Sequence, residues 1–365
     1  AGIRVVQLET TSAALDKGFT AASFVNDAPI VFETPGLENA WRPENYSGNY
    51  FGPMRLREAL TKSRNLVSIR LLRAIGIKYA LDFVERYGFK RQELPANLSL
   101  ALGSGEVTPL ELVRGYAVLA NGGYKVEPYF VQRIESSDGA EMFKANPLTV
   151  CHECEKQPLD IENEPDDLEA LKDIKQNPTA NVAPRVVAAE NVWIMNSILQ
   201  DVIKRGTATR ARELQRKDLA GKTGTTNDQK DAWFSGFNAR NATTVWVGFD
   251  RVAPLGKRET GAQAALPMWM DYMRVALADM PESELEQPAG VVTVRIDPDT
   301  GLLAGANDAH AIFESFRAAD VRLAPWGKIT LRLLGPGRLE LRYDAGAGQH
   351  GKLNLQRMLD RIEGL

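Results

Sequence analysis

The sequence contains little cysteine and little histidine: its 365 residues include two of the first and three of the second. Two cysteines exclude the disulfide framework of a small secreted domain and the four thiolates of a closed zinc site. Three scattered histidines argue against a histidine-based catalytic triad. No run of apolar residues reaches the roughly 18 that a membrane-spanning helix needs, so the sequence offers no candidate for one.

An excess of charge of one sign is also lacking. Lys and Arg number 44 and Asp and Glu number 47, which leaves a net charge of −3 and no basic field that would attract nucleic acid. The 44% hydrophobic and 25% charged residues are typical of a globular protein of about two domains. The first residue is Ala rather than Met, and we therefore treat the sequence as a piece of a longer protein.

Both cysteines belong to one short string, Cys151-His152-Glu153-Cys154. We interpret them as ordinary loop thiols in preference to a local disulfide and, last, to a metal site, which would need a fourth ligand. We expect no metal and no cofactor.

Residues 151–173 hold nine acidic residues against two lysines, which predicts a solvated surface insertion over about residues 151–180. A solubilising loop is the preferred role, and an acidic docking site for a basic partner is the alternative.

Helical and β patterns follow one another in blocks. Apolar residues at three- to four-residue steps predict helices, including one on each side of a polar joint at residues 62–65. Short runs of β-branched and aromatic residues predict antiparallel strands. We therefore expect an α+β fold in which helices flank an antiparallel β-sheet. The further helices are predicted over 78–87, 108–120 and 190–205, and the strands over 218–226, 232–239, 242–250 and 291–296.

Residues 326–365 have a pattern of their own. Apolar and polar residues alternate on both sides of the turn Gly335-Pro336-Gly337, which predicts an amphipathic hairpin, and a short helix over 355–362 follows. This ββα appendage has too little core to be stable alone, so its apolar face must dock on the body or on a second copy. A plain docking hairpin is preferred over the dimerisation module of chromosome-partitioning proteins, which the segment faintly resembles.

Serine, threonine and lysine are the remaining candidates for chemistry, because P-loop, zinc-protease and nucleophile-elbow motifs are absent. The end of a predicted strand carries Lys222, Thr223, Gly224 and Thr225. Their ammonium, hydroxyl and backbone N–H groups can bind a carboxylate and polarise a carbonyl of an extended substrate. Taken alone, the same string of residues is also common in ordinary turns, where its role is structural.

Ser63 and Asn65 lie in the polar joint, where either residue could simply cap a helix. A serine acyltransferase without histidine needs lysines to tune proton transfer, a second hydroxyl to relay the proton, and an amide to hold the substrate backbone. Ser63, Asn65 and Lys222 are the required residue types. We therefore predict that they converge on one cleft.

Ser63-Arg64-Asn65 and Lys222-Thr223-Gly224 match the S-x-N and K-T-G motifs of one known family. Over about residues 11–325 the sequence resembles the transpeptidase domain of class A, bifunctional penicillin-binding proteins, of the 1A type. Residues 1–10 are then interpreted as a remnant strand or linker. The further segments similar to the family are 15–20, 101–111, 121–123, 200–207 and 231–237.

The resemblance implies a serine-type D,D-transpeptidase that cross-links peptidoglycan stem peptides and is acylated by β-lactam antibiotics. Ser63 would relay a proton, Asn65 would hold the donor amide, and Lys222 would assist electrostatically. Thr223 and Thr225, with Gly224 between them, would bind the terminal carboxylate, and the Thr225 N–H would form half of the oxyanion hole. The resemblance also implies the periplasmic face of the inner membrane, an N-terminal anchor absent here, and partner proteins of cell-wall synthesis.

The sequence departs from the family at one decisive point. The nucleophile motif S-x-x-K should lie shortly before Thr11, yet no serine of the sequence is followed three places later by lysine. The family's glycosyltransferase domain is absent too. We expect the chain as printed to form no penicillin adduct, and we favour a truncated or incompletely represented chain over a pseudoenzyme that binds peptides or partner proteins. A β-lactamase or D,D-carboxypeptidase with the same motifs is the third interpretation.

Overall fold

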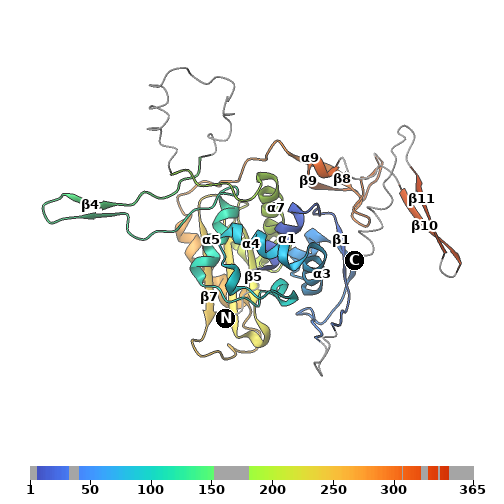
Figure 1. Cartoon of the computed structure of the whole chain (residues 1–365), viewed down its shortest axis with the longest axis horizontal. Helices are drawn as coiled ribbons and strands as arrows, with labels where there is room; N and C mark the ends of the chain where they lie inside the picture. The colour runs from blue at the N-terminus through green and yellow to red at the C-terminus, as the bar shows by residue number, and fades with distance from the viewer. Residues whose placement is uncertain are drawn as a thin grey trace, which may run out of the picture.

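The structure is a computed structural model, and it describes residues 6–32, 41–151, 181–305, 307–321, 328–335 and 338–344. Helices gather around a small antiparallel sheet, and several hairpins extend from this body (Figure 1). The predicted α+β class is confirmed. In the described ranges, no helix combines the length and the apolar content needed to cross a bilayer.

Helix α1 (Val6–Asp16) lies at the centre of the helical layer, with Leu8 and Leu15 fully buried. The remnant strand or linker predicted over residues 1–10 is therefore wrong from Val6 onward. The reason is tertiary: burial outweighs the β preference of a β-branched start, because α1 packs on α2 (Leu56–Thr61), α3 (Asn65–Ile75), α4 (Ile77–Val84) and α7 (Ala189–Arg205). Inside this layer, Ser12 donates to Asn191 Oδ1 at 2.8 Å.

The other helices predicted within the described residues are confirmed within one to three residues. Thr108 forms a capping box with Glu111, which fixes the start of α5. Gly88, at φ 94°, ends the helical stretch that precedes it. The helices are α2 (Leu56–Thr61), α3 (Asn65–Ile75), α4 (Ile77–Val84), α5 (Pro109–Ala120), α7 (Ala189–Arg205), α8 (Leu266–Ala276) and α9 (Ala318–Val321). Shorter turns are η1 (Glu85–Tyr87), η2 (Arg91–Glu93), η3 (Leu98–Leu102), η5 (Thr209–Leu214), η6 (Asn227–Gln229) and η7 (Gly261–Ala265).

The central sheet has the order β5-β6-β7 and is antiparallel throughout, as predicted. Its strands are β5 (Ala220–Thr225), β6 (Asp231–Phe237) and β7 (Ala242–Gly248). Every residue of β6 is buried, because the sheet is covered on both faces. Phe237 packs edge-on against Tyr116 of α5, and Phe234 packs edge-on against Trp269 of α8.

Four two-stranded antiparallel hairpins complete the described fold. One is the predicted C-terminal hairpin, in which Ile329 pairs with Tyr343 and Leu331 with Leu341. The helix predicted over 355–362 lies outside the described residues, as does the acidic insertion from residue 152 to 180. The hairpins are β1 (Phe24–Asp27) with β2 (Gly52–Arg55), β3 (Arg133–Glu135) with β4 (Glu141–Lys144), β8 (Val291–Ile296) with β9 (Ile312–Arg317), and β10 (Lys328–Gly335) with β11 (Arg338–Asp344).

Cys151, at the edge of the described residues, is disulfide-bonded. This contradicts the interpretation of the cysteines as ordinary thiols and agrees with the less favoured disulfide, although Cys154 itself lies outside the described residues. Within those residues, no group of His, Cys, Asp and Glu has the arrangement of a metal site.

Candidate active site

The turn between α2 and α3 presents Ser63 in an unusual backbone conformation. Its φ of 55° lies in the left-handed region, which non-glycine residues rarely adopt. The turn is held because Ser63 N donates to Leu60 O and Arg64 N donates to Ala59 O, at 3.0 and 2.9 Å. A strained residue fixed by its surroundings is a frequent feature of functional sites.

Strand β5 brings Lys222 to this turn. The Lys222 ammonium donates to Ser63 Oγ at 2.7 Å and to Thr223 O at 3.0 Å, and the lysine is only 2% exposed. A buried ammonium is stable only with charged or hydrogen-bonding partners, so the contact fixes both side chains. Of the three residues predicted to converge on one cleft, Ser63 and Lys222 are therefore in contact, across 159 positions of sequence.

Thr223 and Thr225 lie further along β5. The Thr223 and Thr207 hydroxyls are hydrogen-bonded at 2.7 Å, and Gly261 N donates to Thr225 Oγ1 at 3.0 Å. Gly261 has no room for a side chain, since a Cβ would lie 2.4 Å from Gly224 O. The close approach of this backbone therefore holds β5 in place at the predicted substrate-binding threonines.

A cavity of about 330 Å³ opens between the α2–α3 turn, β5 and residues 45–47. Its volume is within the range of small-molecule sites, and hydroxyl and cationic groups contribute to its wall. Lys222, Gly224 and Asn65 are not among the lining residues. These are Asn45, Tyr46, Ser47, Lys62, Ser63, Arg64, Thr207, Thr223, Thr225, Thr260 and Ala262.

Asn65 lies beside the cavity and is 4% exposed. Its Nδ2 donates to Glu44 O at 2.7 Å, while its Oδ1 is buried with no hydrogen-bond partner in the described structure. A buried acceptor without a donor is costly, and an N–H group of a bound ligand would relieve it. The predicted role of Asn65 in holding an amide stays a prediction.

Residues 45–47 form a wall of the cavity that sequence reasoning missed. Asn45 Nδ2 donates to the fully buried Asp27 at 2.7 Å, and Asp27 also accepts from Phe51 N at 3.2 Å. The Arg64 guanidinium lies 4.0 Å from the centre of the Phe51 ring. The only local signal was a cluster of Asn, Ser and Gly, which indicates a turn but not which surface it covers.

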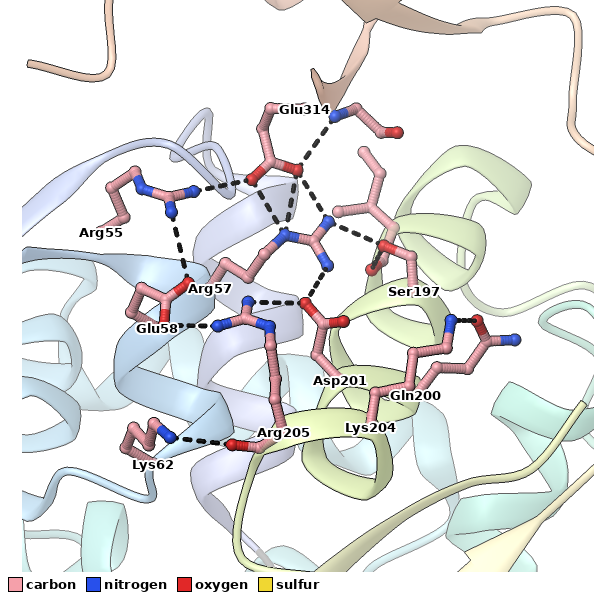
Figure 2. Close-up of polar contacts among 12 residues, drawn as sticks. Arg55, Arg57, Glu58, Lys62, Ser197, Gln200, Asp201, Lys204, Arg205 and Glu314 are labelled. Atoms are coloured by element: carbon pink, nitrogen blue, oxygen red, sulfur yellow. Dashed lines mark hydrogen bonds and ion pairs between the residues drawn. The ribbon is translucent and has the colours of Figure 1, made fainter. Parts of the chain in front are cut away.

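An ion-pair network fixes α2, and hence the Ser63 turn, against α7 and β9 (Figure 2). Glu314 of β9 accepts from Arg57 Nη2 at 2.7 Å and Nε at 2.9 Å, and Asp201 of α7 accepts from Arg57 Nη1 at 3.1 Å. Burial lowers the pKa of Arg57, but the two carboxylates outweigh burial and leave that pKa raised.

The same network reaches the end of α2. Arg205 donates to Glu58 and to Asp201, both at 2.7 Å, and Lys62 Nζ donates to Arg205 O at 2.8 Å (Figure 2). Lys62 immediately precedes Ser63. The Ser63 turn is therefore held by these ion pairs on the side of α7 and by Lys222 on the side of β5.

Comparison with known proteins agrees with this geometry. The model of the penicillin binding protein transpeptidase domain matches residues 6–253. Penicillin-binding protein 1A of Pseudomonas aeruginosa is 49% identical over 328 residues, which are 85% of this chain and 40% of that protein. The protein of the same name from Vibrio cholerae is 38% identical over 333 residues, 84% of this chain and 39% of its own length.

Solved structures give the same assignment. Penicillin-binding protein 1A from Haemophilus influenzae has a TM-score of 0.78 at 38% identity, over 87% of this chain and 48% of that chain. PonA1 from Mycobacterium tuberculosis, at 20% identity and a TM-score of 0.60 over 85% of this chain and 76% of its own, shares the fold. The chain spans about two fifths of the length of the 1A relatives named above. It belongs to the family of penicillin-binding protein transpeptidase domains.

Proposed function

We propose that this chain is the peptide-binding part of a D,D-transpeptidase that cross-links peptidoglycan stem peptides and binds β-lactams. The observation that carries the proposal is the Lys222–Ser63 hydrogen bond of 2.7 Å beside a cavity lined by Thr223 and Thr225. We place the activity on the periplasmic face of the inner membrane, together with other proteins of cell-wall synthesis.

In this proposal the cavity binds the D-alanyl carboxylate of a stem peptide. Thr223 and Thr225 donate hydroxyl hydrogen bonds to that carboxylate, and the positive charge of Lys222 favours it. Acyl transfer requires a proton to reach the leaving amine, and Ser63 is positioned to pass one because it is hydrogen-bonded to Lys222. Asn65 Oδ1 accepts an N–H of the donor peptide.

The nucleophile is the missing component, since no S-x-x-K occurs in the sequence. The chain as printed therefore binds without covalent chemistry. This observation also favours a second candidate function, a pseudoenzyme that holds stem peptides or partner proteins. The gene that encodes the chain separates the two, because an S-x-x-K upstream of Thr11 in that gene supports the enzyme.

Covalent chemistry is tested by intact-mass spectrometry after incubation with benzylpenicillin. We expect the mass of the chain to stay unchanged. A stoichiometric gain equal to the antibiotic would show that another residue acts as nucleophile and would contradict the proposal of binding without acylation.

Binding is tested by calorimetric titration with an N-acyl-D-alanyl-D-alanine peptide. Thr223→Val removes one hydroxyl from the cavity, and loss of a hydrogen bond to a charged group weakens binding about tenfold or more. Thr293→Val is the matched control, because Thr293 also pairs with one hydroxyl, that of Ser315 at 3.3 Å, but lies on β8. A chain that binds no such peptide, or equal weakening by both substitutions, would refute the site.

A further inference from the structure

The β3–β4 hairpin projects from the body as an arm (Figure 1). All seven of its strand residues are exposed, including Ile134 at 48%, Phe143 at 47% and Met142 at 72%. The approach to β3 is exposed as well, with Phe130 at 86%. A two-stranded hairpin with open apolar side chains is marginally stable in water, so a partner surface would stabilise it.

Across the two strands of this hairpin, like charges face each other, although Arg133 and Glu135 also form an ion pair at 3.0 Å along β3. Arg133 stands opposite Lys144, and Glu135 stands opposite Glu141. Like charges directly opposite each other on one face destabilise a strand pair. On the other face Ile134 stands opposite Phe143. Along the strands, the position of this apolar pair is between that of the basic pair and that of the acidic pair.

The outer edge of β3 has the hydrogen-bonding pattern to accept another strand. Ala145 N donates to Gln132 O at 2.8 Å, so the backbone of Gln132 faces β4. Hydrogen-bonded and non-hydrogen-bonded pairs alternate along an antiparallel ladder, and the backbone groups of Arg133 therefore face outward, as do those of Glu135. In the described chain β3 has a neighbouring strand on one side only.

We propose that β3 pairs antiparallel with β3 of a second copy, about a twofold axis through Ile134. Arg133 of one copy then stands opposite Glu135 of the other, and the reverse holds on the far side of the axis. Ile134 meets its own counterpart in the closer, non-hydrogen-bonded pair. The register needs no rearrangement of the hairpin, and a twofold interface uses the same surface on both copies.

This pairing gives each like-charged pair a neighbouring pair of opposite charge from the second copy, in addition to the Arg133–Glu135 ion pair within each chain. On one face of the four-stranded sheet, Lys144 and Arg133 of one copy stand in a row with Glu135 and Glu141 of the second copy. Each basic pair therefore meets an acidic pair of the other copy. The opposite face carries a continuous apolar row in which Phe143 and Ile134 of both copies adjoin. Charge complementarity selects a second copy of this chain as the occupant of the edge.

The test is the oligomeric state of the intact chain by sedimentation equilibrium and by light scattering after size exclusion. We expect twice the chain mass at tens of micromolar, and dissociation on dilution. Glu135→Arg places two arginines opposite each other and should raise the dimer dissociation constant at least tenfold. The double variant R133E/E135R restores opposite charges in the same register and should restore the dimer.

Val275→Lys is the control, because Val275 is 79% exposed but lies on α8. It should leave the dimer unchanged. A monomer at all concentrations overturns the proposal, and so does a dimer that Glu135→Arg does not weaken, which would place the contact elsewhere. Failure of the double variant to recover association overturns the register. Circular dichroism of each variant confirms that the fold is retained.

Discussion

Glu9 offers the sharpest test of the packing of this domain, because a carboxyl group is buried there without hydrogen-bond partners. It lies on α1 at 0% exposure, and neither side-chain oxygen has a partner in the described structure. Burial raises the pKa of Glu9 from 4.5 to about 8. The fold therefore holds this side chain protonated at neutral pH.

The magnitude follows from proton linkage. The unfolded chain releases the Glu9 proton near pH 4.5, whereas the folded chain keeps it to about pH 8. The stability contributed by the neutral carboxyl is complete below pH 4.5 and is lost as the pH rises through 8. At pH 7 the loss amounts to about 3 kcal/mol, at 1.36 kcal/mol for each pH step. Glu9→Gln, which is neutral at every pH, avoids that loss.

The assay is urea unfolding of both proteins between pH 5 and 8. We expect Glu9→Gln to be more stable by about 3 kcal/mol at pH 7 and to lose most of that advantage at pH 5. Glu213→Gln is the control, since the Glu213 side chain is 62% exposed, and it should change stability little. Equal stability of Glu9→Gln and the parent at pH 8 would refute the burial of an uncompensated carboxyl.

Two further substitutions test how the Ser63 turn is supported. Glu314→Ala leaves the largely buried Arg57 without its main partner and should cost about 3 to 5 kcal/mol in unfolding free energy. Removal of the exposed Asp82 pair by Asp82→Asn should change the unfolding free energy little. Gly206→Ala places a Cβ 2.5 Å from Thr61 O and should lower the melting temperature by several degrees. Gly305→Ala, with open space around it, should not. Similar effects of each substitution and its control would contradict this account.

Local structure was largely predictable from the sequence. The helices around Ser63, the antiparallel order of β5, β6 and β7, and the C-terminal hairpin register all follow from residue periodicity and turn residues. These features depend on neighbours within a few positions. The start of α1 was not predictable in this way, because its helical state depends on packing against distant helices.

The candidate site was only partly predictable. The motif strings identified Ser63, Thr223 and Thr225, and the structure adds residues 45–47, which carry no motif. Their position depends on the buried Asp27, whose two hydrogen bonds join segments that periodicity cannot relate. The ion pairs of Glu314 could not be predicted for the same reason, since a charged residue in a predicted strand is expected to face solvent.

The sequence by itself determined the residue types of the site and the family, because short motifs in a fixed order can be recognised without knowing how the chain folds around them. Only the tertiary structure decided that Lys222 reaches Ser63, 159 positions away, because that contact depends on helices and strands packed between them. It also decided that Glu9 is buried and Phe130 exposed, since burial is set by the neighbours that the whole fold supplies.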